Sequence, residues 1–475
     1  MRRTAAIAAL LVAFVLLTRA PYAAQTLWAH DSVLYARALE QGFHVDDELR
    51  AQRPHPPGYI LYVATADVAH GAGLGANDAL VLVSALASAL GAAGIFLFAR
   101  RFAPDQAAVP AAVAYAANPL VWEYSEIAYP YTVLGLLSLI VAAVLFAARG
   151  RGLRGAVLAS VAFGIAGGFR QDLLVLLAPL WLWTMWPLGR RLTVAAAAVV
   201  ASCLVWLAPS VILSDGPEAY LNALGSQATY VSEAYSVFGQ GLPALLMNLA
   251  MTLWAAAWGL LFVAPLAFIG LARLQTSQRR LVLFWCVPPL LIYSTLHIGE
   301  WGYVLSVLPG LYVVAACGVA ALAARVRTMA RPISWAGLVV APAVLFLASS
   351  APFSASAIAR HDAELKARFA YVRDHFPSER TLILTREDFL LVRYYLPDYH
   401  ARQHDPDPYV RLSRRIRAGQ VDHVVVFTPG LAPEQASDVR RVACATGVEL
   451  VYLEVVPGTV LEFRGERYAV ASPAP

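Results

Sequence analysis

The sequence predicts a polytopic α-helical membrane protein with about 11 transmembrane helices and a small C-terminal extracytoplasmic α/β domain. Hydrophobic residues make up 59% of the 475 residues and charged residues 14%, against roughly 25% charged residues in ordinary soluble domains. Apolar runs of about 20 residues, enough to cross a bilayer, recur up to about residue 350. From Ala359 onward charges appear every few positions. We therefore place a membrane domain at residues 1–353 and a soluble domain at 354–475.

The expected spans follow one another with short connections. They lie near residues 4–20, 79–98, 106–122, 129–148, 153–168, 171–187, 192–213, 246–272, 281–297, 302–323 and 333–350. A cleaved signal peptide is an alternative for the first of them, because two arginines precede its apolar core and the small residues of YAA at 22–24 follow it.

Arginines mark every second connection between these spans. They are Arg2, Arg3, Arg100, Arg101, Arg149, Arg151, Arg154, Arg190, Arg191, Arg273, Arg279, Arg280, Arg325, Arg327 and Arg331. Acidic residues gather in the other connections, namely Asp31, Glu40, Asp46, Asp47, Glu48, Glu123, Glu126, Asp172, Asp215, Glu218, Glu233 and Glu300. The positive-inside rule makes the arginine connections cytoplasmic. The N-terminus is then inside and the tail outside.

The apolar stretch at 59–68 would invert every later connection if it crossed the membrane. We therefore expect a short interfacial helix there, within a long first external loop at 21–78. Since topology accounts for the arginines, the formal net charge of +5 indicates no nucleic-acid partner. Three of the four cysteines lie in apolar runs and Cys444 is alone in the tail, so no disulfide framework is expected.

The first external loop carries the most distinctive residues. It begins WAHDSVLYARALEQG, in which Asp31 heads a predicted helix and shares a face with Tyr35. It continues to RPHPPGYILY at 53–62, where a Pro-Pro-Gly turn lies between His55 and Tyr59. Taken singly, Asp31 is equally well explained as a helix cap, and Pro-Pro-Gly as a simple turn.

Three further external turns carry polar and aromatic residues. EYSEIAYPYT at 123–132 contains Glu123 and Glu126, and GGFRQD contains Arg170. HIGEWGY at 297–303 contains His297. An arginine at the membrane interface usually faces an anion. For Arg170 that anion is either a substrate phosphate or a neighbouring carboxylate, Asp172, Glu123 or Glu126.

This order of features resembles the GT-C superfamily of membrane glycosyltransferases, and in particular its protein O-mannosyltransferase-like branch. An acidic residue heads a helix after the first span (Asp31), a HPPGY-type segment follows, and an arginine lies at a later external turn (Arg170). The resemblance implies inverting transfer of a sugar, with mannose the family's commonest case. The donor would be a polyprenyl-phosphate-linked sugar and the acceptor a protein, lipid or glycan at the outer membrane side. Glu300 departs from the basic residue expected in its turn.

The resemblance also implies roles for individual residues. Asp31 would be the general base. The residues that would bind substrate are Arg53, His55, Tyr59, Glu123, Glu126, Arg170 and His297. No cofactor is certain, because some GT-C enzymes require a metal and others do not. Mg²⁺ or Mn²⁺ is compatible with Asp46, Asp47 and Glu48 joining Asp31, although such acidic clusters are usually solvated.

Two other functions compete with this interpretation. A transporter or lipid flippase would carry ionisable residues near the bilayer midplane, whereas polar residues here gather at the outer rim. A non-catalytic membrane scaffold would tolerate replacement of Asp31. Arginine-rich, lysine-poor usage favours a bacterial plasma (inner) membrane protein.

The tail reads as alternating helices and strands. Helices are expected at 356–375, 387–396 and 432–446, and strands at 381–385, 423–427 and 450–455. LEFRGERYAV at 461–470 resembles a hairpin with Gly465 in its turn. The tail contains no phosphate loop or nucleophile elbow, so we expect it to bind the acceptor or stabilise the fold.

Overall fold

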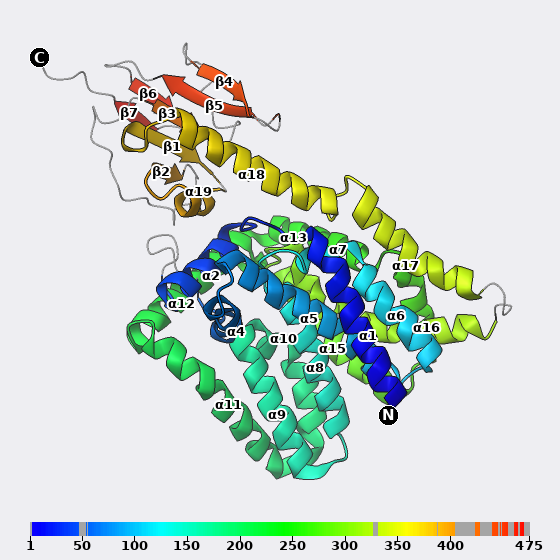
Figure 1. The fold of residues 1–475 in the computed structure, drawn as a ribbon. Helices are drawn as coiled ribbons and strands as arrows, with labels where there is room; N and C mark the ends of the chain where they lie inside the picture. Colours follow the sequence, from blue (N-terminus) through cyan, green and yellow to red (C-terminus); the bar gives the residue numbers. More distant parts are fainter. Residues whose placement is uncertain are drawn as a thin grey trace, which may run out of the picture.

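The computed structural model describes residues 2–46, 54, 56–325, 331–386, 388–403, 423–427, 439–444, 447, 449–454, 460–463 and 466–469. A bundle of helices forms the larger part, and a small sheet domain covers one end of it (Figure 1). That end also carries α2 (His30–Gln41) and α12 (Pro217–Tyr235). The N-terminus of α1 (Arg2–Arg19) lies at the other end.

The remaining helices of the bundle follow in chain order. They are η1 (Ala20–Tyr22), α4 (Ile60–Gly71), α5 (Ala76–Ala99), α6 (Asp105–Ala117), α7 (Pro119–Tyr124), α8 (Tyr131–Ala148), α9 (Gly152–Phe169), α10 (Asp172–Met185), η2 (Trp186–Arg191), α11 (Leu192–Ile212), α13 (Val237–Leu260), η3 (Leu261–Val263), α14 (Ala264–Arg273), α15 (Thr276–Thr295), η4 (Trp301–Ser306), α16 (Leu308–Ala323) and α17 (Arg331–Ala348).

Every predicted span contains a helix, so the helical nature of this region is confirmed. Within the described part of the chain, 6 helical segments are long and apolar enough to cross a membrane. One of them, Asp172–Ile212, has 41 residues and is bent at Gly189, where φ is 54°. The count of eleven crossings stays a prediction, as does their direction.

Two predicted spans are interrupted. The side chain of Asn118 accepts hydrogen bonds from the N–H groups of Leu120 and Val121 at 3.0 and 3.3 Å, which ends α6 and starts α7. The span at 246–272 divides into α13 and α14 at Leu261, whose φ is 39°. The stretch expected to be interfacial forms α4, whose 12 residues extend roughly 18 Å, too short for a bilayer of about 30 Å.

Among its described residues, the C-terminal domain contains α18 (Ala355–His375), η5 (Ser378–Arg380), α19 (Phe389–Tyr395) and seven strands. The strands are β1 (Thr381–Thr385), β2 (His400–Gln403), β3 (His423–Val426), β4 (Val439–Ala443), β5 (Glu449–Glu454), β6 (Val460–Phe463) and β7 (Glu466–Ala469). Five form a sheet in the order β2-β1-β3-β5-β4, with β1 parallel to β2 and β3. β6 and β7 form a separate hairpin.

Most elements predicted in the tail are present, with two differences. The helix expected at 432–446 is wrong over residues 439–443, which form β4. Pairing with β5 in the antiparallel register Val439↔Leu453 gives this segment the backbone hydrogen bonds that a helix would otherwise supply. β2 was not expected. The turn predicted at Gly465 lies outside the described residues.

The C-terminal domain is hydrogen-bonded to the first long loop, at residues 21–78. The carboxylate of Asp362 in α18 accepts hydrogen bonds from Gln25 N at 2.8 Å, Thr26 N at 2.9 Å and Thr26 Oγ1 at 2.6 Å. The hydroxyl of Tyr395 accepts one from Leu27 N at 2.8 Å. One buried apolar cluster includes residues of α2, α4, α5, α18, α19, β1 and β3. The domain therefore shares a core with the first loop.

Candidate functional site

Asp31 lies in the first turn of α2, where the helix dipole favours a carboxylate. Ala29 precedes the helix with extended backbone angles, so the chain enters α2 sharply. Ser32 Oγ donates to the carbonyl of Ala128 at 2.9 Å, which holds this turn against the connection between α7 and α8. Asp31 remains partly exposed. The predicted base is thus fixed in place and open to solvent.

Arg170 connects α9 and α10 in an extended conformation and is buried. Its guanidinium donates to Asp172 through Nε (3.3 Å to Oδ1) and Nη2 (3.0 Å to Oδ2). The ion pair that the sequence offered as an alternative for Arg170 is therefore present. The guanidinium also forms a side-chain hydrogen bond with Tyr303.

Three tyrosine rings surround the Arg170 guanidinium. Its Cζ lies 5.1 Å from the ring centre of Tyr59, 4.8 Å from that of Tyr131 and 5.0 Å from that of Tyr303. These distances are typical of cation–π contacts. The tyrosines come from the first loop, the start of α8 and η4. Segments far apart in the sequence therefore meet at Arg170, and we call Arg170 with these three tyrosines the arginine–tyrosine cluster.

Gly302 allows η4 to approach this cluster. A Cβ at that position would lie 2.3 Å from Cγ of Tyr131, closer than any side chain permits. The absence of a side chain lets the backbone pack directly on the Tyr131 ring, with Tyr303 and Tyr131 ring centres 5.4 Å apart. The close packing of η4 on Tyr131 therefore explains why position 302 is a glycine.

The HPPGY segment contacts the arginine–tyrosine cluster through Tyr59. Tyr59 adopts a left-handed conformation (φ 50°, ψ 47°) just before α4 and is buried. The Pro57 carbonyl accepts hydrogen bonds from Gln171 Nε2 at 3.3 Å and Tyr220 Oη at 3.1 Å. Gln171 and Tyr220 thus hold this turn in place by hydrogen bonds. The predicted substrate ligands Arg53 and His55 lie outside the described residues.

The turn before η4 brings two titratable groups toward Asp31. Burial lowers the pKa of His297 to about 4, with the Asp31 charge acting in the opposite direction. Burial raises the pKa of Glu300 to about 7, and the Asp31 charge raises it further. The hydroxyl of Tyr124 donates to Glu300 Oε2 at 3.2 Å. His297 is therefore neutral at pH 7, and Glu300 titrates near that pH.

Glu123 and Glu126 face other parts of the molecule. Glu123 Oε2 accepts a hydrogen bond from Ser354 N at 3.2 Å, where the C-terminal domain begins. Glu126 Oε1 accepts one from Trp122 Nε1 at 3.0 Å, and the positive charge of Arg19 is nearby. Burial raises the pKa of both carboxyls. Their direct contacts favour a structural role, and their role in substrate binding stays a prediction.

A divalent-cation site is not formed by the described residues. In that part of the chain, no group of three or more His, Cys, Asp or Glu side chains is placed to hold one metal ion. Asp47 and Glu48, which the sequence offered as ligands beside Asp31, lie outside the described residues.

The sequence showed that these turns are aromatic but not which rings contact one another. Tyr129 lies 5.3 Å from Tyr131 between ring centres, and Tyr235 at the end of α12 lies 4.7 Å from His297. Tyr129 and Tyr131 both belong to the run AYPYT, so their proximity was visible in the sequence. Nothing in the sequence pattern placed α12 beside the turn of His297.

No protein-family model and no curated protein sequence matches this chain. Solved structures do. ArnT from Cupriavidus metallidurans bound to undecaprenyl phosphate is 14% identical, with a TM-score of 0.62, over 95% of this chain and 97% of that chain. Its apo form is 15% identical, with a TM-score of 0.56 over 94% of this chain and 97% of that chain.

An oligosaccharyltransferase from Archaeoglobus fulgidus, tethered to an acceptor peptide, is similar as well. It is 11% identical, with a TM-score of 0.53, over 88% of this chain and 68% of that chain. Identities this low show the fold and not the reaction. The helical bundle, the first-loop helices and the C-terminal domain therefore together share the fold of ArnT and of the archaeal oligosaccharyltransferase.

Proposed function

We propose that this chain is a membrane glycosyltransferase that moves a sugar from a polyprenyl-phosphate-linked donor to an acceptor. The observation that carries the proposal is a partly exposed carboxylate, Asp31, whose charge acts on the arginine–tyrosine cluster, on a fold similar to that of ArnT. The charge of Asp31 acts on Tyr59 and Tyr303 of that cluster. An acid and a buried cation thus share one site.

Each residue then has a chemical task. Asp31 removes the proton of the acceptor group as that group attacks the anomeric carbon from the side opposite the phosphate, which inverts the configuration. Arg170 donates hydrogen bonds to the departing phosphate and balances its charge. Asp172 fixes the guanidinium plane by its two hydrogen bonds. His297, neutral at pH 7, supplies a hydrogen-bonding group without added charge.

The finer features of the proposal rest on the sequence resemblance. These are the protein O-mannosyltransferase-like branch, a mannose donor, roles for Arg53 and His55, and a protein, lipid or glycan acceptor. The arginine distribution supports an N-terminus inside a bacterial plasma membrane and a C-terminal domain outside it. ArnT, solved with undecaprenyl phosphate, supports the choice of a polyprenyl phosphate as donor carrier.

The test replaces Asp31 with Asn and measures transfer from a panel of radiolabelled polyprenyl-phosphate sugars in membranes. We expect a fall in rate of about 1,000-fold or more, because the base is lost while its shape is kept. Asp67→Asn is the matched control, since Asp67 is an exposed carboxylate on α4 in the same loop. Full activity of Asp31→Asn would refute the base assignment. Absence of transfer by the native protein with every donor would favour a transporter.

A further inference from the structure

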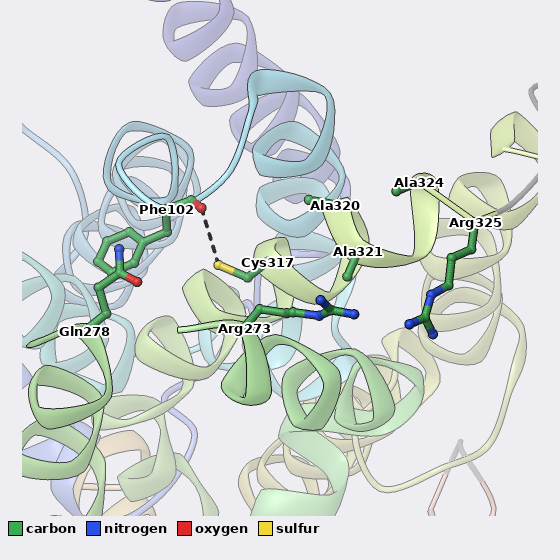
Figure 2. A pocket seen from close by; sticks show the side chains of 8 residues that line it. All are labelled: Phe102, Arg273, Gln278, Cys317, Ala320, Ala321, Ala324 and Arg325. Atoms are coloured by element: carbon green, nitrogen blue, oxygen red, sulfur yellow. Dashed lines mark hydrogen bonds between the residues drawn. The ribbon is translucent and has the colours of Figure 1, made fainter. Parts of the chain in front are cut away.

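A cavity lies far from Asp31, and the proposed reaction does not use it. It has a volume of about 310 Å³ and opens between the ends of several bundle helices (Figure 2). Its lining residues are Phe102, Arg273, Gln278, Cys317, Ala320, Ala321, Ala324 and Arg325. α16 begins just after Tyr303 and ends at this cavity. Its 16 residues separate the two sites by roughly 24 Å.

Close helix packing fixes the walls of the cavity. A Cβ on Gly318 would lie 2.0 Å from the Leu266 carbonyl oxygen, and one on Gly270 would lie 2.0 Å from that of Val314. α14 and α16 therefore touch backbone to backbone. This contact holds Arg273, the last residue of α14, near Arg325, which follows α16. On another side, Cys317 Sγ lies 3.7 Å from the Phe102 carbonyl oxygen.

The two arginines extend into one space without a carboxylate between them. Figure 2 shows both guanidinium groups directed toward the same side of the cavity. Among the described residues, neither Arg273 nor Arg325 forms an ion pair. Asp105, the acid of the neighbouring connection, is paired with Arg100 at 2.5 Å. Two like charges facing one space favour an anion between them.

Capping of α14 does not explain Arg273. Basic side chains at helix C-termini commonly bond the last carbonyl groups. Here Arg279 makes that contact, because its Nη2 donates to the Ala272 carbonyl at 3.0 Å. Gln278 Oε1 accepts a hydrogen bond from Gln275 N at 2.9 Å and so caps α15. Arg273 remains available to a ligand in the cavity.

Exposed apolar side chains also occur on α14, the helix that ends at Arg273. Phe268 and Leu271 of α14 are exposed by 77% and 43% of their surface. The cavity itself is floored by Ala320, Ala321 and Phe102. A ligand with an anionic head and an apolar tail matches both parts, and basic pockets between membrane helices bind phosphate headgroups of lipids.

We propose that this cavity binds the phosphate headgroup of an anionic phospholipid. Arg273 and Arg325 donate hydrogen bonds to the phosphate, and the acyl chains lie along the exposed face of α14. The site is at the arginine-rich end of the bundle, opposite the Asp31 site, and is independent of the proposed glycosyl transfer.

Native mass spectrometry of the purified full chain tests this site with phosphatidylglycerol and phosphatidylcholine of identical acyl chains. We expect the native protein to prefer phosphatidylglycerol. The double variant Arg273→Gln/Arg325→Gln should bind it at least about tenfold more weakly, since hydrogen bonds between charged groups are lost. Arg190→Gln/Arg191→Gln is the matched control, because it removes two exposed arginines of η2. The control should change the affinity less than about twofold.

A second variant and a competitor complete the test. Ala321→Leu fills the cavity without a change of charge and should also weaken binding, and it serves if the double variant does not fold. Free inorganic phosphate at millimolar concentration should not displace the lipid. Equal binding of phosphatidylglycerol by the native protein and both variants would overturn the site. Displacement by free phosphate, without preference between the lipids, would overturn the lipid assignment.

Discussion

Arg170 and Asp172 are joined by two hydrogen bonds on one edge of the guanidinium, at 3.3 and 3.0 Å. Asp172 begins α10, so the first turn of that helix orients the buried guanidinium of Arg170. The rings of Tyr59, Tyr131 and Tyr303 lie around the same guanidinium, with centres 4.8–5.1 Å from its Cζ. The carboxylate of Asp172 therefore orients the Arg170 side chain, and this ion pair is compatible with a role of Arg170 in substrate binding.

Substitution of Arg170 tests this arrangement. Arg170→Lys keeps the charge but cannot form the two-point contact with Asp172 or present a planar donor edge. Under the proposed function we expect kcat/KM for donor transfer to fall about 100-fold. Steady-state transfer assays with a polyprenyl-phosphate sugar measure this.

Arg154→Lys is the control for that experiment, since Arg154 is an exposed arginine in the first turn of α9. It should retain native kinetics. If Arg170→Lys transfers sugar as fast as the native protein, Arg170 has a structural role only.

Glu300 and His297 give opposite pH dependences of stability. In the native protein the pKa of Glu300 is raised from 4.5 to about 7. Between these two pH values the native carboxyl keeps a proton that the unfolded chain releases. The contribution of Glu300 to the free energy of unfolding therefore falls as pH rises. The pKa of native His297 is lowered from 6.5 to about 4. Between these two pH values the unfolded chain binds a proton at this imidazole that the native protein does not bind. The contribution of His297 to the free energy of unfolding therefore falls as pH falls. Between pH 4.5 and 6.5 the two effects oppose each other.

Single variants should separate these effects. Thermal unfolding in detergent between pH 4.5 and 6.5 should give a Tm that rises with pH in Glu300→Gln and falls with pH in His297→Gln, each relative to the native protein. Identical pH profiles of the two variants would show that neither group is perturbed as the geometry indicates.

Asp362 should be important for docking of the C-terminal domain. Asp362→Ala removes three hydrogen bonds to a buried carboxylate and leaves the Gln25 and Thr26 donors without it. We expect a loss of about 2–3 kcal/mol, seen as a lower Tm and as faster proteolysis near residue 25. Asp374→Ala, at an exposed position of the same helix, should leave both measurements unchanged. Equal stability of the two variants would contradict the docking contact.

Gly318 tests the contact between α14 and α16. Gly318→Ala places a Cβ where the Leu266 carbonyl lies 2.0 Å away, so the helices must separate. Overpacking of this kind costs about 1–3 kcal/mol. Gly337→Ala in α17 is the control, since a Cβ there meets nothing within 4 Å, and its better helix propensity predicts equal or higher stability. Comparison of the two Tm values decides the matter.

Much of the fold was predictable because hydrophobic length and arginine placement are strong local signals. The helix at 355–375 and the strands β1, β3 and β5 follow from short patterns of the same kind. The break at Asn118 and the strand β4 were not predictable. The first depends on one side chain capping the next helix, and the second on pairing with β5.

The sequence named candidate residues for the site, whose roles stay predictions, but it did not show how they are arranged. Asp31 and Tyr59 belong to the first loop and Arg170 to the connection between α9 and α10, and the structure brings Tyr59 onto the Arg170 guanidinium within reach of the Asp31 charge. The sequence could not show that Glu123 contacts Ser354, because that contact joins positions 231 residues apart. Nor could it show that Glu300, which departs from the family pattern, lies near Asp31.

The bond between Thr26 and Asp362 also has a consequence during biosynthesis. These partners are separated by 336 residues, so at about 5–20 residues per second the first loop emerges roughly 17–70 s before α18 exists. During that interval the face of α2 that later packs on α19 stays uncovered. In a nascent chain, this face of the first loop is therefore exposed until synthesis reaches the C-terminal domain.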